Sequence, residues 1–118
     1  MGPKDIIEDE KEVVAVTLFD LLRAFHEVVK RFESQAAMEL DQEEVTIEQK
    51  LVEMRKMLLI HDSLVFSSFF TRVKSKRHLI VTFLALLELV RLREIWLYQE
   101  KAFEEIHITR SKSAGETA

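Results

Sequence analysis

Apolar residues recur along this chain with helical spacing near its start. From Leu18 to Phe32 they come every three or four residues with charged side chains between them, which predicts an amphipathic helix over roughly 18–37. Thr17 precedes this helix as an N-cap, with Asp20 three residues later as in a capping box. The run 13–16 is rich in valine and is expected to be extended.

A second set of elements is predicted beyond the polar stretch 39–44. Residues 45–47 are expected to form a short strand. A Thr-x-x-Gln capping box at Thr46 then starts a helix that ends near Ile60. Ser63 is expected to cap a short helix that runs through Phe70.

The most apolar part of the chain is 79–92, where only Thr82, Glu88 and Arg91 are polar. Its composition predicts a helix. One side of that helix carries Leu79, Ile80, Phe83, Leu86, Leu87 and Val90, and the other carries Val81, Leu84, Ala85, Leu89 and Leu92. A helix that is apolar on two sides must be buried on two sides. Either it is the centre of the core, or another protein covers part of it.

Alternation of apolar and polar residues over 93–99 and 104–109 predicts an antiparallel hairpin. Three helices followed by a hairpin is the winged-helix plan. We therefore predict a mainly α protein, with an amphipathic helix followed by a C-terminal winged-helix domain of three helices and a two-stranded wing. The expected parts are a flexible N-terminus (1–12), a partner-binding helical segment (13–38), a linker (39–44), the winged helix (45–109) and a disordered tail (110–118).

Composition narrows the function. The 118 residues carry a net charge of −4, which argues against indiscriminate nucleic-acid binding. No cysteine is present, and no glycine or proline lies between residues 4 and 114, so phosphate-cradling loops and turns with positive φ are not expected. The composition fits a cytoplasmic protein. No signal peptide is visible, and 79–92 is too short and too charged to span a bilayer.

Catalytic chemistry is not predicted. The four histidines, His26, His61, His78 and His107, do not share metal-ligand spacing on one element. The serines lack a Gly-x-Ser-x-Gly elbow, and no P-loop occurs. We expect no enzyme activity, no metal and no cofactor.

Three stretches resemble a known family. The run from Val81 to Val90, followed by 93–99 and 103–108, resembles the C-terminal end of segregation and condensation protein A, the kleisin subunit of the bacterial SMC condensin complex. The stretch 46–50 resembles the start of that family's winged helix, and 17–25 resembles the helix before it. The resemblance covers roughly residues 13–108.

This resemblance implies a structural adaptor in chromosome condensation and segregation, located in the cytoplasm with the nucleoid. In the family, the C-terminal winged helix docks on the ATPase head of the SMC protein, and the middle region binds a dimer of segregation and condensation protein B. The family's N-terminal domain, which binds the neck of the other SMC subunit, has no counterpart in this sequence. Ring closure by this polypeptide alone is therefore not expected.

The resemblance also implies candidate contact residues. The SMC head is expected to contact Phe83, Leu87, Val90, Trp96 and Tyr98, with the first two as exposed anchors. Segregation and condensation protein B is expected to contact Leu18, Leu22, Phe25 and Val29, because a helix laid in a groove uses such spacing. The alternatives stay open. Phe83 and Leu87 can be ordinary core, and with Leu87 in the core the interface is expected on Val81, Leu84 and the wing. The helix 18–32 can be packed on its own winged helix.

A second function class is a winged-helix transcription regulator, since many winged helices read DNA with their third helix. The helix 79–92 has almost no side chain for base edges, which need Arg, Lys, Asn or Gln. The basic residues Arg72, Lys74, Lys76, Arg77 and His78 are interpreted as a solvated connector, with phosphate contact as the alternative. Direct nucleic-acid binding is thus not favoured. Self-association through an uncovered apolar side is expected for the isolated chain.

Overall fold

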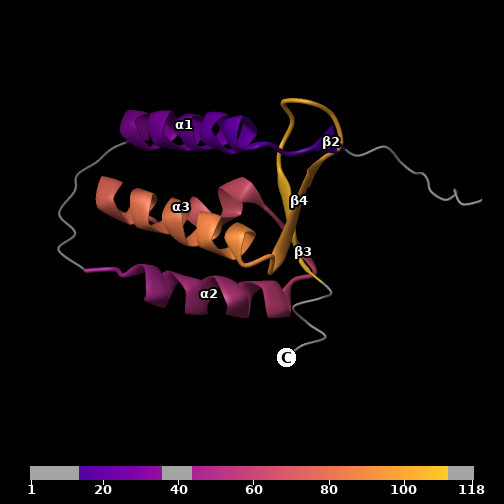
Figure 1. The fold of residues 1–118 in the computed structure, drawn as a ribbon. Coiled ribbons are helices and arrows are strands. Elements are labelled where there is room, and N and C mark those ends of the chain that lie inside the picture. The colour runs from indigo at the N-terminus through magenta and orange to yellow at the C-terminus, as the bar shows by residue number, and fades with distance from the viewer. Residues whose placement is uncertain (1–13, 36–43, 112–118) are drawn as a thin grey trace, which may run out of the picture.

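Three α-helices lie side by side against a small sheet in a computed structural model, which describes residues 14–35 and 44–111 (Figure 1). The helices are α1 (Leu18–Gln35), α2 (Ile47–Ile60) and α3 (Lys76–Arg91). Helix α3 lies between α1 and α2 and contacts both. The predicted mainly α architecture with a wing is confirmed.

Each long helix begins where its sequence provides a cap. The backbone N–H of Asp20 donates to Thr17 Oγ1 (3.2 Å), and the N–H of Thr17 donates to Asp20 Oδ2 (2.9 Å). At α2, Thr46 and Gln49 form the reciprocal capping box. At α3, Ser75 accepts a hydrogen bond from the N–H of His78. These bonds satisfy N–H groups that have no partner within the helix.

The sheet has four strands in the order β2-β4-β5-β3. The predicted hairpin is present as β4 (Ile95–Gln99) and β5 (His107–Arg110), which pair antiparallel with Leu97 opposite Ile108. The expected extension before α1 is present as β2 (Val14–Ala15), which pairs with the end of β4. This pairing joins the segment that precedes α1 to the wing.

Two local predictions are wrong. Residues 45–47 form no strand, because Thr46 is the N-cap of α2 and Ile47 is already its first residue. Ser63 does not cap a helix: it begins the third strand, β3 (Ser63–Val65), which pairs with β5. The expected short helix starts only after this strand, as the 3-10 helix η1 (Phe66–Phe70). Long-range pairing with β5 determines the conformation of residues 63–65, and no local sequence pattern predicts that pairing.

Positive φ angles occur without glycine. Arg93 (φ 61°) follows the C-cap Leu92 of α3, and its N–H donates to the carbonyl of Val90. The N–H of Glu94 donates to the carbonyl of Leu89, which completes a Schellman motif. Phe103 (φ 71°) takes a similar conformation in the loop of the wing. The expectation that this glycine-poor chain avoids such turns is therefore wrong.

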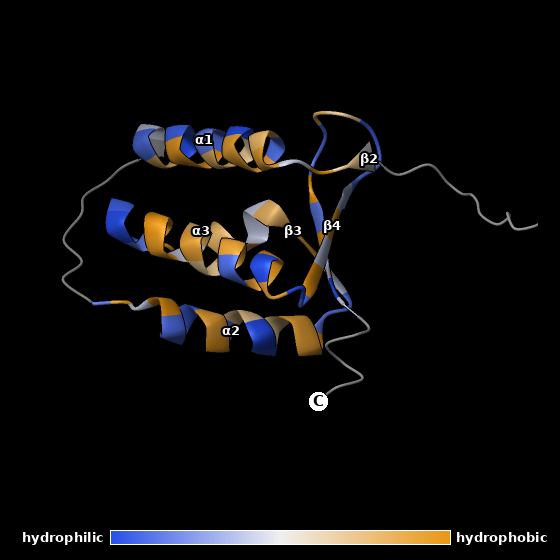
Figure 2. Cartoon of the chain, viewed as in Figure 1, coloured by the Kyte–Doolittle hydropathy of each residue, from blue (hydrophilic) through white to orange (hydrophobic). Residues whose placement is uncertain are grey.

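The core is centred on α3. Its fully buried side chains include Leu79, Ala85, Leu86 and Leu89, and they pack with residues of α1, α2, η1 and the sheet. Thr82 is also fully buried, and its hydroxyl donates to the carbonyl of His78 (2.8 Å). This bond lets a polar side chain lie in an apolar core without leaving a donor unpaired. In Figure 2, hydrophobic colours predominate along the middle of α3, which lies between α1 and α2.

Helix α1 belongs to the same apolar cluster as the winged helix. Leu21 and Val28 are buried in that cluster together with Phe66 and Phe83. The predicted division into a helical segment (13–38) and a winged helix (45–109) stays a prediction. The predicted flexible N-terminus (1–12) lies outside the described residues, as do most of the linker (39–44) and most of the tail (110–118).

Candidate protein-binding surfaces

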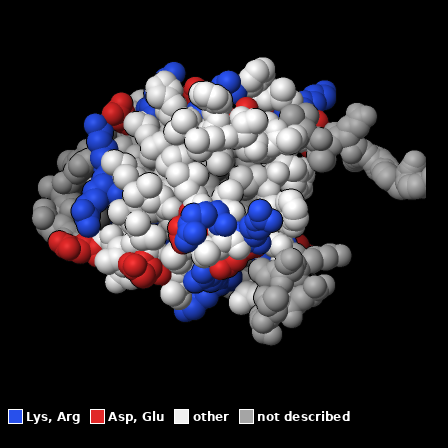
Figure 3. Space-filling model, in the orientation of Figure 1, with Lys and Arg blue, Asp and Glu red and all other residues white. Residues whose placement is uncertain are grey.

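A ridge of apolar side chains on α3 remains uncovered. Ile80 is 51% exposed and Leu84 43% exposed, and Leu87 beside them is half-buried. We call these three residues the α3 ridge. Glu88 and Arg91, joined by a hydrogen bond from Arg91 Nε to Glu88 Oε1 (3.0 Å), border it. Figure 3 shows a broad area without charged side chains on the face drawn, with charged side chains around it and across the lower part of the face.

The position of the α3 ridge shows which side of the central helix is exposed. Both predicted apolar sides of α3 are largely buried, one toward α1 and η1 and the other toward α2. Exposure falls on the boundary between them, along the edge that carries Glu88 and Arg91. The opposite boundary, which carries Thr82, faces the interior. Two neighbouring helices cover the two apolar sides, so only the edge between those helices stays open.

The expected exposure of Phe83 is wrong. Its side chain is only 6% exposed, and its ring stacks on Phe25 of α1 with centroids 4.3 Å apart and an interplanar angle of 8°. The ring also meets Phe66 of η1 edge-on, at 6.3 Å. Aromatic pairs of this kind stabilise a core beyond their buried area. Phe83 is therefore a core residue in this structure, as the alternative interpretation held.

The other residues predicted to contact an SMC head do not form one surface with Phe83. Leu87 and Val90 are half-buried against the core. Trp96 and Tyr98 alternate with the core-facing residues of β4, so they lie on the outer face of the sheet. Trp96 is 65% exposed, whereas Tyr98 stacks on His107 of β5 at 4.9 Å. The fold thus separates a helical surface from a surface on the wing.

The four residues of α1 that were predicted to contact segregation and condensation protein B lie in two different environments. Leu18 and Leu22 are exposed, whereas Phe25 and Val29 are half-buried and pack against the core. The stacking of Phe25 on Phe83 accounts for the burial of Phe25. Only the first half of the predicted stripe is therefore open to a partner while α1 lies on the winged helix.

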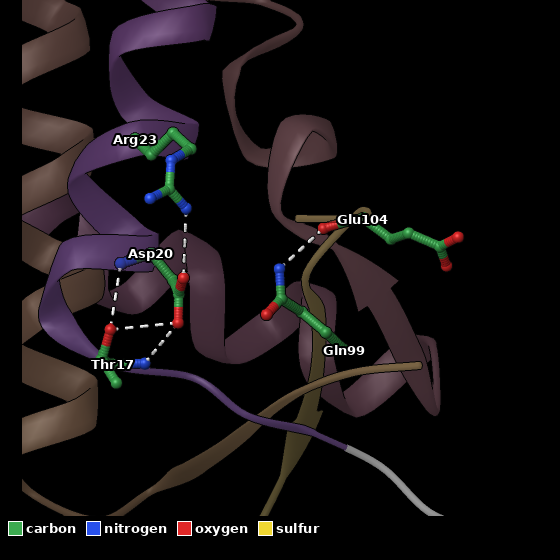
Figure 4. Close-up of polar contacts among 5 residues, drawn as sticks. All are labelled: Thr17, Asp20, Arg23, Gln99 and Glu104. Atoms are coloured by element: carbon green, nitrogen blue, oxygen red, sulfur yellow. Dashed lines mark hydrogen bonds and ion pairs between the residues drawn. The ribbon is translucent and has the colours of Figure 1, made fainter. Parts of the chain in front are cut away.

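Polar contacts hold the start of α1 near the wing. The guanidinium of Arg23 lies over the ring of Phe103, 4.5 Å from its centroid, in a cation–π contact. Arg23 also pairs with Asp20 (3.3 Å), and the hydrogen bond from the backbone of Thr17 is the main cause that lowers the pKa of Asp20 (Figure 4). On the wing, the amide of Gln99 donates to the carbonyl of Glu104 (2.8 Å). The contact between Arg23 and Phe103 joins α1 to the loop between β4 and β5, whereas the other bonds lie within the start of α1 or within the wing.

The basic connector before α3 has a structural contact of its own. Lys76 pairs with Glu33 near the end of α1 (3.0 Å), which ties α1 to the start of α3. Arg72, Lys74 and Arg77 are exposed, and His78 is half-buried. The exposed cations agree with a solvated connector. The exposed apolar residues of α3 provide no hydrogen-bonding groups for base edges.

A metal centre and a membrane span are both absent from residues 14–35 and 44–111. No group of three or more His, Asp or Glu side chains in these ranges is placed to hold a metal ion. No helix in the same ranges combines the length and the hydropathy that a membrane span requires.

Sequence reasoning missed Ile80 and gave Leu84 only a secondary place. The two residues lie on different predicted apolar sides of α3; Leu84 was predicted as a contact only for the case that Leu87 is core, and Ile80 was not predicted as one. The available signal was their angular position, since both lie close to the edge marked by Glu88 and Arg91. That signal could not be used without knowing which neighbours cover the two sides.

A helical domain with a wing and uncovered apolar residues has the features of a protein-interaction module. A family model described as "Segregation and condensation protein ScpA" matches residues 4–111 of the chain. The chain therefore belongs to the segregation and condensation protein A family. This membership confirms the resemblance inferred from the sequence and supports a role in chromosome segregation and condensation.

Curated relatives carry the same name. Segregation and condensation protein A of Bacillus pumilus is 36% identical over 121 residues, covering 94% of this chain and 47% of the relative. The proteins of Bacillus velezensis and Bacillus subtilis are 34% and 33% identical, with the same coverage. The chain thus spans a little under half the length of these relatives. No solved structure matches. The comparisons point to no catalytic family and do not support a transcription regulator.

Proposed function

We propose that this chain is a kleisin-type structural adaptor of an SMC complex, associated with the nucleoid in the cytoplasm. Its winged helix docks on the ATPase head of the SMC protein, and α1 contributes to the binding of segregation and condensation protein B. The chain itself carries out no chemistry. It acts by burying apolar surface against its partners.

The α3 ridge is the observation that carries this proposal. Ile80 and Leu84 expose large apolar side chains on the helix that DNA-binding winged helices use to read bases. Such side chains are costly in water and favourable in a desolvated interface. Membership of the segregation and condensation protein A family supports the SMC head as the partner.

The wing is a second candidate for the same contact. Trp96 is the only tryptophan of the chain and stands on the outer face of the sheet. Tryptophan is enriched among the residues that dominate interface energies. Phe83 has no direct role in this proposal, because Phe25 covers it.

Co-elution with an isolated SMC head domain tests the first contact. The unmodified chain is expected to co-elute, and Leu84→Arg is expected to lose the complex because a charge would enter the interface. Val52→Arg is the matched control, since Val52 is similarly exposed but lies on α2. Trp96→Arg tests the wing separately. Absence of a complex with the unmodified chain, or full binding by both Leu84→Arg and Trp96→Arg, would reject the proposed docking.

Helix α1 contributes Leu18 and Leu22 to the second contact. Both are exposed one turn apart, so they form a short apolar stripe on α1. Leu22→Glu is expected to weaken capture by the dimer of segregation and condensation protein B. Phe19→Glu is the control, because Phe19 is also exposed on α1 but points about 60° away from Leu22. Equal capture of both variants would contradict this assignment.

A further inference from the structure

A small apolar pocket opens between α2, the end of α3 and the start of the wing. Its apolar walls are Leu58 and Leu59 of α2, Leu89 of α3 and Ile95 of β4. Its volume is about 170 Å³. A cavity of about 150 Å³ with similar walls is large enough for a benzene ring. The pocket therefore has room for one aromatic side chain.

The pocket is lined by more positive than negative side chains. Arg55 binds Glu94 through two hydrogen bonds of 2.8 Å, so both carboxylate oxygens of Glu94 are occupied. Arg110 also lines the pocket and is exposed, and its side chain forms no hydrogen bond or ion pair within residues 14–35 and 44–111. Two guanidinium groups thus face one carboxylate. The excess positive charge lies on Arg110, in a chain whose net charge is −4.

The sequence accounts for this arrangement. The Schellman turn at Arg93 ends α3 and directs Glu94 toward Arg55, so the pair fixes the wing against α2. Ile95, which comes next, faces the core side of the sheet and closes the pocket. Arg110 lies opposite Ile95 on β5. The unpaired cation is therefore held by strand pairing beside an apolar wall.

We propose that this pocket is a docking site for a segment of a partner protein that inserts an aromatic side chain and places an adjacent carboxylate on Arg110. Apolar walls select the ring, and a charge-assisted hydrogen bond to the guanidinium selects the acidic neighbour. The site does not depend on the proposed SMC contact. Leu89 lies on the side of α3 that faces α2, away from the α3 ridge.

A titration with a short peptide tests the proposal. The probe is the blocked tetrapeptide acetyl-Gly-Phe-Asp-Gly-amide, added to the full chain with isotope-labelled methyl groups. The methyl resonances of Leu58, Leu59, Leu89 and Ile95 are expected to shift. Acetyl-Gly-Phe-Asn-Gly-amide is expected to bind about tenfold more weakly, because it lacks the charge that Arg110 recognises.

Two variants with matched controls complete the test. Arg110→Gln is expected to remove the preference for the Asp peptide, whereas Arg72→Gln removes an equally exposed charge elsewhere and is expected to retain it. Leu59→Ser is expected to weaken binding of both peptides, whereas Val52→Ser, also on α2, is not. All four positions are exposed or near the surface, and thermal melting checks that each variant is folded.

Several results would overturn the proposal. One is the absence of methyl shifts at millimolar peptide. Another is equal affinity of the unmodified chain for the Asp and Asn peptides. A third is that inorganic phosphate produces the spectral changes that Arg110→Gln abolishes, while the methyl resonances of the pocket stay unchanged. That result would identify a simple anion site rather than a docking pocket for a protein segment.

Discussion

Phe83 and Leu84 are neighbours in sequence with opposite environments. Phe83 is buried against Phe25 and Phe66, whereas Leu84 stands on the α3 ridge. Adjacent residues of a helix are about 100° apart, so one can lie in the core while the next faces solvent. Hydropathy does not separate them, because both are strongly apolar. Their functions must therefore be tested by substitution.

Phe83→Ala is expected to lower the free energy of unfolding by about 3–5 kcal/mol, since it removes a buried ring and leaves a cavity. Leu84→Ala is the control and is expected to change it by less than about 1 kcal/mol. Urea denaturation followed by circular dichroism measures both values. A small effect of Phe83→Ala would mean that the stack with Phe25 does not form in solution.

Glu94 makes a specific contribution to acid sensitivity. Its hydrogen bonds with Arg55 lower its pKa below the ordinary value of 4.5. A carboxyl group with a lowered pKa stabilises the fold above its ordinary pKa, and this contribution is lost as the pH falls through the folded-state value.

Arg55→Gln is expected to destabilise the chain by about 0.5–1 kcal/mol at pH 7, because the pair is partly exposed. The difference from the unmodified chain should shrink as the pH falls from about 5 to about 3. Melting temperatures across this range measure it, with Arg72→Gln as the control. Parallel pH profiles for the unmodified chain and Arg55→Gln would show that Glu94 has no lowered pKa.

At the scale of elements, local capping signals and long-range pairing decided different parts of the fold. Thr46 and Gln49 form the capping box that their spacing predicted. Ser63 has an equally suitable side chain but lies in β3, where its partner on β5 is Thr109. Pairing with β5, which lies far along the chain, therefore outweighs the local preference of Ser63 for a helix start.

Thr46→Ala is expected to lower the free energy of unfolding by about 1 kcal/mol, because the N–H of Gln49 at the start of α2 loses its side-chain acceptor. Ser63→Ala is expected to have little effect, since Ser63 is exposed on β3 and caps no helix. Thermal melts of the two variants give the comparison. A larger effect of Ser63→Ala would indicate that it caps a helix after all.

At the scale of the whole molecule, α1 is part of one core with the winged helix. Leu21 and Val28 lie in the shared apolar cluster, and Glu33 and Arg23 add polar contacts to α3 and to the wing. The pairing of β2 with β4 joins the same two parts at the sheet. Contacts of this extent favour cooperative unfolding.

Leu21→Ala is expected to destabilise α1 and the wing together, by about 2–5 kcal/mol. Far-ultraviolet circular dichroism reports the helices, and the fluorescence of Trp96, the single tryptophan, reports the wing. The two signals should give the same transition midpoint in the unmodified chain and in the variant. Separate midpoints would support the predicted division into a helical segment and an independent winged helix.

The order of elements and the family resemblance could be predicted because they depend on local spacing. Helix periodicity, the caps at Thr17 and Thr46, and the alternation in the hairpin all depend on residues a few positions apart. Strand β3 and the two turns with positive φ could not be predicted. Their conformations depend on contacts with distant residues and, at Arg93, on hydrogen bonds at the end of α3.

The mainly α class, the three long helices and the wing follow from the order of residues alone, because periodicity and capping are properties of neighbouring residues. The packing of distant elements selects which apolar residues are buried. It placed Phe83 under Phe25, left Ile80 and Leu84 uncovered, and brought Arg110 beside the pocket at Ile95. Apolar character states that a side chain prefers burial, but the neighbours that provide that burial are known only when distant elements are packed together.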